Sequence, residues 1–229
     1  MPEFPTQLAT VQTNKQPVPT LDEEMALFEQ GYSFIAGVDE AGRGCLAGPV
    51  VAAALILPLG VHELASRLAG VRDSKQLTAQ ARDRLYDVIM LHALATGVGM
   101  GSVELIDEIN ILQATKHAMY AAIAQLSVPA QALLIDALIL PRLSLPQRSI
   151  IKGDERCLSI AAASIVAKVT RDRLMLQLHE QYPLYGFNQH KGYGTPAHLA
   201  ALQEHGVTPL HRKSFAPVRE LISGLFTAP

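Results

Sequence analysis

Residues 33–57 read SFIAGVDEAGRGCLAGPVVAAALIL, and this stretch sets the expected fold. It holds two apolar runs, at 33–38 and 50–57, on either side of the glycine-rich turn Gly42-Arg43-Gly44. Short apolar runs bounded by turn residues are typical of strands, so we expect two paired strands here. The first run leads into the acidic pair Asp39-Glu40. An acidic pair inside so apolar a segment favours a functional role over a structural one.

Downstream of this strand pair, helix-like and strand-like segments alternate. Apolar residues at helical spacing predict three helices, the first with Thr78 as its N-cap: 78–95, 114–126 and 159–181. Apolar or glycine-alternating runs predict three more strands: 96–103, 132–136 and 148–152. Shorter helices are expected over 21–30 and from Thr195-Pro196 to Gly206. This order predicts an α/β fold with a mixed central sheet flanked by helices and a C-terminal helical extension.

The composition fits a globular protein and says little about ligands. The chain has 229 residues, of which 49% are hydrophobic and 17% charged, with a net charge of −2. That charge neither supports nor excludes binding to a polyanion such as nucleic acid. The two cysteines, Cys45 and Cys157, lack zinc-ligand spacing and are expected to be small packing residues in a reducing compartment.

The two ends of the chain set the expected organisation and location. Residues 1–30 are predicted to form a mobile N-terminal extension, and residues 31–229 a single domain. We see no secretory signal, and the longest apolar run, 49–59, is too short to cross a membrane. We therefore expect a soluble, cytoplasmic protein without a membrane partner.

Four acids fall where strands are expected to end: Asp39, Glu40, Asp136 and Asp154. In open α/β sheets, reactive groups gather at strand ends. Two like charges ~4 Å apart cost roughly 4 kcal/mol at an effective dielectric near 20, so a cluster of four makes sense when cations fill it. Carboxylates suit Mg²⁺ or Mn²⁺, and a pair of such ions can act on a phosphodiester. The alternative is that each acid forms a turn or caps a helix.

The sequence around these acids resembles a known family along most of its length. GVDEAGRG at 37–44 resembles the signature of type 2 ribonuclease H, the bacterial ribonuclease HII family. Further motifs follow in that family's order: DSKQL at 73–77, DEINI at 107–111, LID at 134–136, KGD at 152–154, AASIVAKVTRD at 162–172, HKGYGT at 190–195 and HRKSF at 211–215. The resemblance runs from about residue 31 to about residue 218, and so many motifs in order make it specific.

The resemblance implies a ribonuclease H-like fold and an endonuclease activity. It implies cleavage of RNA in RNA/DNA hybrids and at single ribonucleotides embedded in duplex DNA, leaving 5′-phosphate and 3′-hydroxyl ends. Two features depart from many members: Cys45 stands where they have Pro, and Ala137 where they have Gly. Neither removes a ligand, because the family's metal-binding, catalytic acids map onto Asp39, Glu40, Asp136 and Asp154.

The family's substrate-reading groups map onto two glycine-rich segments. Its sugar-reading turn maps onto Gly42-Arg43-Gly44, whose amides and guanidinium are expected to bond a ribose 2′-hydroxyl, the group that separates RNA from DNA. A tight turn that requires glycine accounts for the same residues, and both readings can hold together. Its junction-sensing tyrosine maps onto Tyr193, expected to stack beside the cut. Lys75, Lys168 and Lys191 are expected to contact phosphates, with solvated surface charge as the alternative.

Other polar residues in these motifs are expected to be structural. Asp172 lies on the predicted long helix beside arginines, so an ion pair on the helix surface is expected rather than metal binding. His190 and His211 are expected to be structural or surface groups. For Asp154, capping of the following helix is the alternative to metal binding.

Other functional hypotheses stay open on the sequence alone. One is a type 3 ribonuclease H or another nuclease of this fold, although about 30 residues before Gly31 are too few for the extra N-terminal domain of type 3 enzymes. Another is a non-catalytic nucleic-acid-binding module, which would need a broken acid set. The C-terminal segment 221–226 fits either a sliding-clamp contact or a last helix packed on the body. We otherwise expect a monomer.

Overall fold

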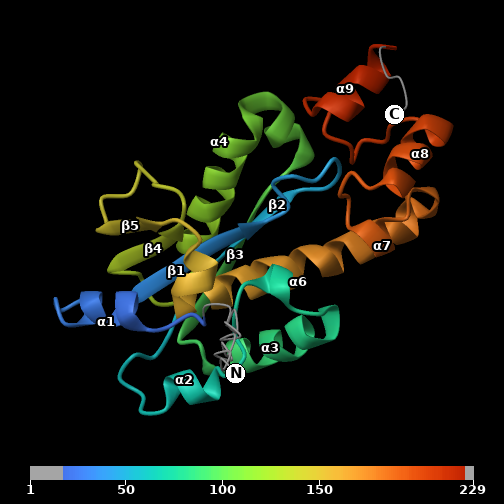
Figure 1. Cartoon of the computed structure of the whole chain (residues 1–229). Coiled ribbons are helices and arrows are strands. Elements are labelled where there is room, and N and C mark those ends of the chain that lie inside the picture. The colour runs from blue at the N-terminus through green and yellow to red at the C-terminus, as the bar shows by residue number, and fades with distance from the viewer. Residues whose placement is uncertain (1–17, 225–229) are drawn as a thin grey trace, which may run out of the picture.

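The computed structural model describes residues 18–224, which build on a five-stranded sheet with the order β3-β2-β1-β4-β5 (Figure 1). Strand β1 (Ile35–Ala41) pairs antiparallel with β2 (Val50–Ile56), which pairs antiparallel with β3 (Ala95–Gly101). On its other side β1 pairs parallel with β4 (Ala132–Asp136), and β4 pairs parallel with β5 (Gln147–Ile150). The predicted strand pair and the mixed central sheet are therefore confirmed.

Helices cover both faces of the sheet (Figure 1). Helix α4 (Val103–Ala124) packs on β3 and β2, whereas α6 (Leu158–Gln181) packs on the other face against β1 and β2. Helix α3 (Ala79–His92) lies against α6. The glycines of β3 allow the close approach of α4, because a Cβ atom on either Gly97 or Gly99 would lie 2.1 Å from a carbonyl oxygen of that helix.

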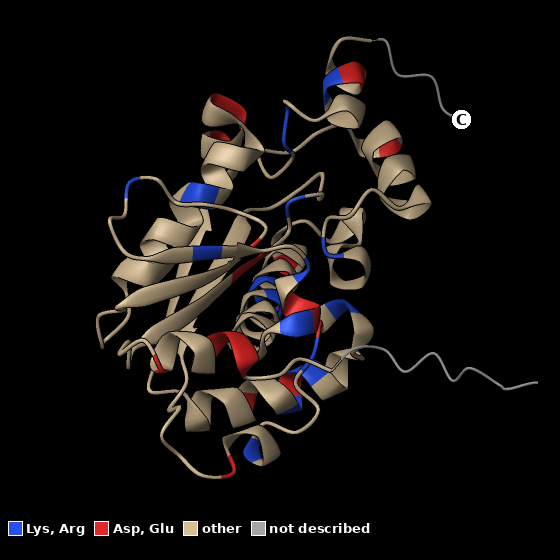
Figure 2. Ribbon diagram, turned by 60° about the vertical axis from the view of Figure 1, so that its left-hand side comes forward, with Lys and Arg blue, Asp and Glu red and all other residues tan. Residues whose placement is uncertain are grey.

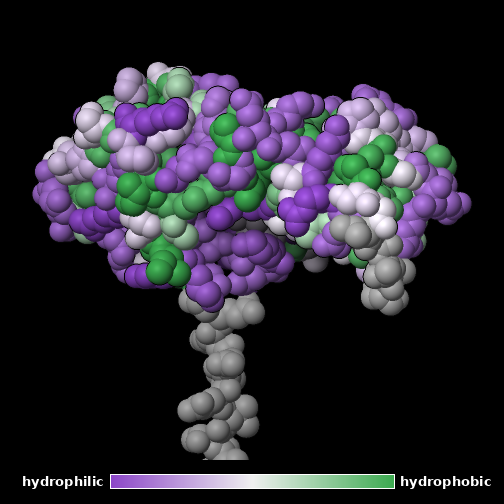
Figure 3. All heavy atoms as spheres, turned by 90° about the horizontal axis from the view of Figure 1, so that it is seen from above, coloured by the Kyte–Doolittle hydropathy of each residue, from purple (hydrophilic) through white to green (hydrophobic). Residues whose placement is uncertain are grey.

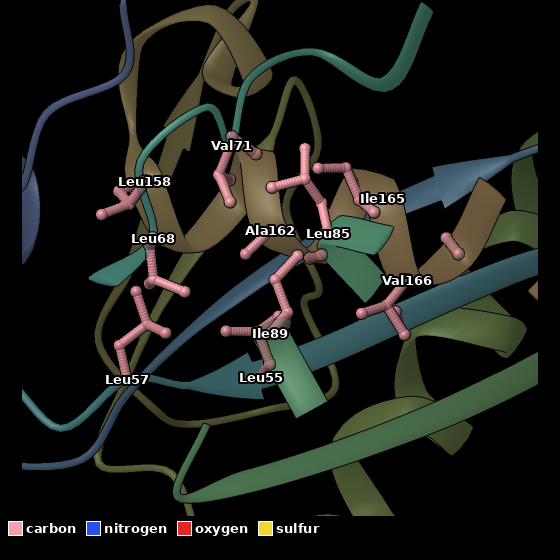
Figure 4. Packing of buried hydrophobic residues seen from close by; sticks show 14 of the residues in the cluster. Leu55, Leu57, Leu68, Val71, Leu85, Ile89, Leu158, Ala162, Ile165 and Val166 are labelled. Atoms are coloured by element: carbon pink, nitrogen blue, oxygen red, sulfur yellow. The ribbon is translucent and has the colours of Figure 1, made fainter. Parts of the chain in front are cut away.

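The sheet divides the core into two apolar layers. Figure 4 shows one of them, where Leu55 of β2, Ile89 of α3 and Val166 of α6 meet. The other layer packs alanines of α4, including Ala118 and Ala122, against the opposite face. Each fully buried Leu, Ile or Val contributes about 1.5–3 kcal/mol through the hydrophobic effect. A core poor in aromatic residues, as the composition indicates, suits helices that lie close to a sheet.

Helix α4 begins a full three turns before the predicted start at residue 114. Ser102 caps it by accepting a hydrogen bond from the Leu105 amide (3.2 Å), so the preceding strand ends at Gly101 rather than at residue 103. Asn110 interrupts the helix with a φ of 68°, and its side chain accepts from the Gln113 amide to start the second part. The periodicity was broken at this kink, which hid the first part of the helix.

The predicted boundary at residue 31, between a mobile extension and the folded domain, does not hold for residues 18–30. Residues 1–17 of the predicted mobile extension lie outside the described residues. Thr20, however, forms a β-bridge with Cys157, and helix α1 (Asp22–Phe28) packs on the body with Glu24 and Leu27 buried. The Glu24 carboxylate accepts a 2.7 Å hydrogen bond from the amide of Ser159 in the first turn of α6. Residues 18–30 therefore belong to the folded body.

The C-terminal part forms a separate small layer at one end of the sheet (Figure 1). It contains α7 (Phe187–His190), α8 (Pro196–His205) and α9 (Ala216–Ile222), which confirms the predicted C-terminal helical extension. Thr195 caps α8 by accepting from the His198 amide (3.3 Å), and Gly206 ends it, as expected. Residues 225 and 226 of the proposed clamp segment lie outside the described residues, whereas Leu221 packs on this layer.

Single-turn elements account for most of the remaining differences from the sequence prediction. They are α2 (Leu64–Arg67), the 3₁₀ turns η1 (Ser74–Gln76) and η2 (Pro183–Tyr185), α5 (Gly153–Arg156) and α7. One turn carries too little periodicity to be recognised. Two of these turns, η1 and α5, carry Lys75 and Asp154.

The surface of the described part is mixed in character. Figure 3 shows hydrophobic residues scattered among hydrophilic ones on the face seen from above. In Figure 2, basic and acidic segments lie close together near the lower helices rather than on separate faces. Within residues 18–224, none of the helices is both long enough and apolar enough to cross a membrane.

Candidate active site

The acids predicted to converge are held at one edge of the sheet. Asp39 and Glu40 lie near the end of β1, and Asp136 ends β4. These strands are parallel neighbours, with Val38 opposite Ile135, so their ends meet. Asp154 comes from α5, whose first residue, Gly153, donates its amide to the Asp136 Oδ1 atom at 2.8 Å.

Burial and mutual repulsion raise the pKa values of three of these acids. Burial, followed by the negative charges of Glu40, Asp136 and Asp154, raises the pKa of Asp39 well above its usual value. Burial also raises the pKa of Glu40 and of Asp154, and the charge of Asp136 adds to both shifts. The four carboxylates therefore act on one another through space, as the sequence predicted for acids that converge.

Two cations partly neutralise these acids. Arg43 Nη1 lies 3.0 Å from Glu40 Oε1, and Lys75 Nζ lies 3.3 Å from Asp154 Oδ2. Each contact lowers the pKa of its carboxyl partner, although burial remains the larger influence. The second oxygen of Glu40 is buried without a hydrogen-bond partner among the described residues. Four acids with two cations leave a site that is short of positive charge.

The donor set fits a hard divalent cation, although it does not form a closed cage. Within the described part of the chain, no group of three or more His, Cys, Asp and Glu side chains is arranged to hold a metal ion. Mg²⁺ does not require such a cage, because it keeps several waters and binds one or two carboxylates together with substrate phosphates. The unpartnered Glu40 oxygen and the raised pKa of Asp39 both favour an added positive charge.

These groups surround a pocket of about 390 Å³. Its walls come from β1 and the following turn, from η1, from the end of β4, and from α6 and the loop before α8. The lining residues are Asp39, Glu40, Ala41, Gly42, Arg43, Gly44, Ser74, Lys75, Asp136, Ser164, Lys168 and Tyr193. The structure therefore brings the predicted site residues to one place, with two exceptions. Asp154 adjoins the pocket through its ion pair with Lys75. Lys191 instead lines a different pocket, together with Arg82 and Asp172.

Two fully buried arginines, Arg171 and Arg212, contact the backbone of the glycine-rich turn. Arg212 donates to the carbonyl oxygens of Gly42 (2.7 Å) and Arg43 (2.8 Å). Gly42 has a φ of 94°, and a Cβ atom there would lie 2.1 Å from Arg171 Nε. Only glycine fits at this position.

The same turn leaves backbone donors available. Among the described residues, the amides of Arg43 and Gly44 have no hydrogen-bond partner, and Gly44 is exposed with open space beside it. The carbonyls, by contrast, are engaged by Arg212. A turn with fixed carbonyls and free amides is suited to hydrogen-bond a sugar hydroxyl or phosphate oxygen.

Tyr193 lies on the opposite wall of the pocket. Its side chain is partly exposed, and Lys168 Nζ lies 5.4 Å from the centre of its ring. Lys168 also pairs with Asp172 at 2.7 Å, and Arg82 Nη2 lies 3.8 Å from the same carboxylate. The predicted ion pair of Asp172 is therefore present, but its main partner is Lys168 rather than the adjacent arginines.

The alternative role of Asp154 as a helix cap is wrong. Asp154 lies within α5, and α6 has no side-chain cap from its own N-cap residue, Cys157. Glu24 takes that place through its bond to the Ser159 amide. Cys157 and Cys45 are both buried, as predicted for packing residues, although the Cys157 thiol also donates to Glu24 (3.1 Å).

The sequence reasoning did not single out Ser74, Ser164, Arg171 or Arg212. Ser164 Oγ bonds Ser74 Oγ at 2.8 Å and joins α6 to η1 across the pocket. The two arginines had one available signal, because Arg171 lies in the motif AASIVAKVTRD and Arg212 in the motif HRKSF. Their partners are backbone carbonyls distant in sequence, so that signal could not name what they bind.

The chain matches the family described as Ribonuclease HII over residues 36–218. A ribonuclease HII from Bacillus cereus (strain Q1) is 56% identical over 199 residues, which cover 87% of this chain and 75% of the relative. A ribonuclease HII from Chloroflexus aurantiacus is 54% identical over 208 residues, which cover 91% of this chain and 98% of the relative.

Solved structures share the fold. The ribonuclease H2 of Pyrococcus horikoshii OT3 has a TM-score of 0.71 at 27% identity, covering 84% of this chain and 98% of its own. A ribonuclease HII of Archaeoglobus fulgidus, solved in complex with PCNA, has a TM-score of 0.67 at 29% identity, covering 80% and 95%. A Bst-RNase HIII structure with Mn²⁺ shares the fold alone, at 20% identity and a TM-score of 0.63, over 86% of this chain and 72% of its own. The expected ribonuclease H-like fold is confirmed.

Proposed function

Because the chain belongs to the ribonuclease HII family and is a ribonuclease H enzyme, we propose that it cleaves the RNA strand of RNA/DNA hybrids and incises duplex DNA at single embedded ribonucleotides. The products would carry 5′-phosphate and 3′-hydroxyl ends. The strongest support is one pocket that combines linked acids with a turn whose amides are free. Acids of this kind serve phosphodiester hydrolysis, and the turn can read a 2′-hydroxyl.

Asp39, Glu40, Asp136 and Asp154 are the proposed ligands of two divalent ions, Mg²⁺ or Mn²⁺. Asp39 and Asp136 would be shared, and Glu40 and Asp154 would each complete one shell. When bound, such a pair stabilises the attacking and leaving oxygens of a phosphodiester. The chain orients the shared ligands in advance, because the Glu40 amide holds Asp39 Oδ1 (2.7 Å) and the Gly153 amide holds Asp136 Oδ1 (2.8 Å).

The glycine-rich turn, Tyr193 and two lysines that line the pocket are proposed to bind the nucleic acid. The amides and guanidinium of Gly42-Arg43-Gly44 would bond the 2′-hydroxyl at the cut, and Tyr193 would stack on the neighbouring nucleotide. Lys75 is mostly exposed and would contact a phosphate once its partner Asp154 is engaged by an ion. Lys168 lies between Tyr193 and Asp172, so its charge would act on a phosphate near the tyrosine.

The first experiment compares three labelled duplexes in Mg²⁺ and in Mn²⁺: an RNA/DNA hybrid, duplex DNA with one ribonucleotide, and the matching all-DNA duplex. We expect cleavage of the first two and none of the third. Activity on hybrids without incision at the single ribonucleotide would instead favour the type 3 specificity. Binding without cleavage of any duplex would refute the catalytic proposal.

Asp83 provides a matched control for substitutions of the acids. It is an exposed aspartate of α3 outside the pocket, paired with Arg173. Asp83→Asn should keep full activity, whereas Asn at Asp39 or Asp136 should abolish turnover with both ions. Equal loss at Asp83 would mean that the assay reports a general effect of charge.

We also propose that the C-terminal segment 221–226 contacts a sliding clamp. The A. fulgidus structure named above is a complex with PCNA. In this chain Ile222 at the end of α9 is 52% exposed and so is available for contact. Deleting residues 221–229 should remove binding to a purified clamp while cleavage of naked duplexes persists. Clamp binding that survives the deletion would refute the contact.

The remaining expectations from the sequence stay predictions. We propose that residues 31–229, together with the docked α1, act as one catalytic unit, in the cytoplasm and as a monomer. Size-exclusion chromatography with light scattering checks the last point, and a mass of about twice that of one chain would contradict it.

A further inference from the structure

Two fully buried histidines, His198 and His211, lie behind the wall that carries Tyr193. Their Nε2 atoms are 3.1 Å apart, and both rings pack against Phe187 in the C-terminal layer. His198 belongs to α8, whereas His211 follows a loop. The proposed catalytic steps use neither ring, so the presence of two imidazoles in an apolar layer calls for a reason.

The neighbours of these rings fix where each proton lies. The Thr208 amide donates to His211 Nδ1 at 2.9 Å, so that nitrogen has no proton. The Thr208 hydroxyl, also 2.9 Å from Nδ1, can then only donate to it. His211 must then carry its proton on Nε2 and donate it to His198 Nε2. His198 consequently carries its own proton on Nδ1, which lies 2.9 Å from the carbonyl oxygen of Tyr193. A carbonyl oxygen only accepts and an amide N–H only donates. The Thr208 amide at one end and the Tyr193 carbonyl at the other therefore require the same direction of donation through both rings.

Both rings must also be neutral for this arrangement to exist. A proton added to either ring would place two N–H groups against each other across 3.1 Å, or against the Thr208 amide. Burial lowers the pKa of each histidine to about 4, which agrees with the geometry. The pair is therefore a one-way chain of hydrogen bonds at neutral pH.

The chain of bonds ends on the residue that faces the pocket. The backbone of Tyr193 is held on both sides, because its amide donates to the His190 carbonyl (3.0 Å). Its carbonyl accepts both from the Thr195 amide (2.8 Å) and from His198 Nδ1, which is the one side-chain donor to it among the described residues. Its side chain is 40% exposed, and Lys168 Nζ lies 5.4 Å from the centre of its ring. The preceding Gly192 has a φ of 84° and donates to His190 Nδ1, which also gives that ring a fixed tautomer.

We infer that His198 and His211 are positioning residues that hold Tyr193 against the nucleotide beside the cut, through a hydrogen-bond chain running from Thr208 through His211 and His198 to the Tyr193 carbonyl. The inference rests on the proposed stacking role of Tyr193. It predicts that loss of the chain of hydrogen bonds impairs recognition of a single ribonucleotide more than hydrolysis itself, because the acids come from β1, β4 and α5 rather than from this loop.

The direct test is the tautomeric state of each ring, read by long-range ¹H–¹⁵N NMR on the full chain without substrate. We expect a neutral Nδ1–H tautomer for His198 and a neutral Nε2–H tautomer for His211 at pH 7. The Nε2–H tautomer or a charged ring at His198 would overturn the inference. This readout does not depend on the proposed function.

The kinetic test compares His198→Ala with His198→Asn, whose amide nitrogen takes the place of Nδ1 and keeps the bond to Tyr193. Loss of one buried hydrogen bond corresponds to about a tenfold effect. We expect His198→Ala to lower the ratio of single-ribonucleotide incision to hybrid cleavage by about tenfold, and His198→Asn to restore most of it. Equal loss on both substrates, or no rescue by Asn, would contradict a positioning role.

Tyr193→Ala is measured beside these variants to separate the two proposals. If Tyr193→Ala lowers the ratio of single-ribonucleotide incision to hybrid cleavage, the stacking role of Tyr193 is supported. The results for His198→Ala and His198→Asn then decide the positioning inference. If Tyr193→Ala leaves the ratio unchanged, the stacking role of Tyr193 is wrong. The positioning is then judged by the Tyr193 amide resonance, which His198→Ala should shift and His198→Asn should largely preserve. An unmoved resonance in both variants would overturn it.

Discussion

The two walls of the pocket are built in different ways. The acidic wall is set by backbone pairing, because Asp39 and Asp136 lie at the ends of parallel neighbouring strands. The wall that carries Tyr193 lies in a loop between two short helices and is set by hydrogen bonds from buried polar side chains. Topology thus fixes the groups proposed for chemistry, whereas a polar network fixes those proposed for recognition.

The two walls also differ in what burial does to their charges. On the acidic wall, burial raises the pKa of Asp39, so its ionised form opposes folding near neutral pH. On the tyrosine wall, burial lowers the pKa of His198 and His211, and their neutral forms are the native ones. The buried negative charge of the acidic wall destabilises the fold, and a bound cation would relieve this. The neutral histidines of the tyrosine wall need no added charge.

The largest expected effect comes from Asp39→Asn. Turnover should fall on the order of 10³-fold or more, because a shared ion ligand is lost. Thermal stability without metal should rise, because a buried charge is removed while the oxygen that accepts from the Glu40 amide is kept. A gain of ~1 kcal/mol corresponds to about 2–4 °C in a chain of this size.

Calorimetry in a chelator and single-turnover cleavage check these two opposite changes in one variant. A melting temperature that falls, with activity retained, would contradict the assignment of Asp39 as a repelled ligand. Asp83→Asn serves as the control and should change neither quantity.

Arg212→Ala tests the connection between the two walls. Its guanidinium links the C-terminal layer to the glycine-rich turn, and its loss leaves the Gly42, Arg43 and Gly48 carbonyls without these bonds. We expect a destabilisation of roughly 3–5 kcal/mol, measured by urea unfolding. Arg212→Lys keeps the charge but not the fork of donors, so it should fall between wild type and Ala. A loss below ~1 kcal/mol in the Ala variant would contradict this link.

Acidification should act in opposite directions on the two walls. The folded pKa of His198 and His211, about 4, lies below the unfolded value of 6.5. Their stabilising contribution is present above pH 6.5 and is lost as pH falls toward 4. The raised pKa of Asp39 acts in the other direction, so its repulsion is relieved as pH falls through its folded value.

Urea unfolding of the metal-free protein between pH 7 and pH 4.5 separates these contributions. His198→Asn should lose less stability than wild type on acidification, because one titrating ring is gone. Asp39→Asn should be most stabilised, relative to wild type, at pH 7. Parallel curves of unfolding free energy against pH for all three proteins would contradict the lowered pKa of His198 and the raised pKa of Asp39.

Ala137→Gly has the smallest expected effect. Ala137 follows Asp136 and has a φ of 50°, a conformation that favours glycine. Relief of this strain, less the entropy that glycine gains in the unfolded chain, should stabilise the protein by about 0.5–1 kcal/mol. Ala200→Gly, in the exposed part of α8, is the control and should destabilise by about 1 kcal/mol. Differential scanning fluorimetry that shows both variants losing stability would contradict the strain.

The difference between the walls also explains which features the sequence could predict. The strands β1, β2 and β4 were recognised from local apolar runs, and the acids at their ends followed from sheet geometry. Among the described residues, the pocket then brought together the predicted residues except Asp154 and Lys191. Local patterns suffice where the backbone decides the position.

Features that depend on contacts between distant segments were missed. The docking of α1 rests on Glu24 reaching Ser159, and the shape of the glycine-rich turn rests on Arg212. The kink at Asn110 removed the periodicity that would have revealed the start of α4. His198 and His211 gave no sign in the sequence of their bond to each other, because only the fold places them together.

The most direct test of the account uses one duplex with three sugars at a single position: ribose, deoxyribose and 2′-O-methylribose. The methylated sugar keeps the oxygen but removes the hydroxyl proton that a reading group senses. With Mg²⁺ or Mn²⁺, we predict a cut at the ribose leaving 5′-phosphate and 3′-hydroxyl ends, and intact strands for the other two. Equal cleavage of the deoxyribose duplex, or no cleavage at the ribose, would contradict a pocket that joins sugar recognition to its acids.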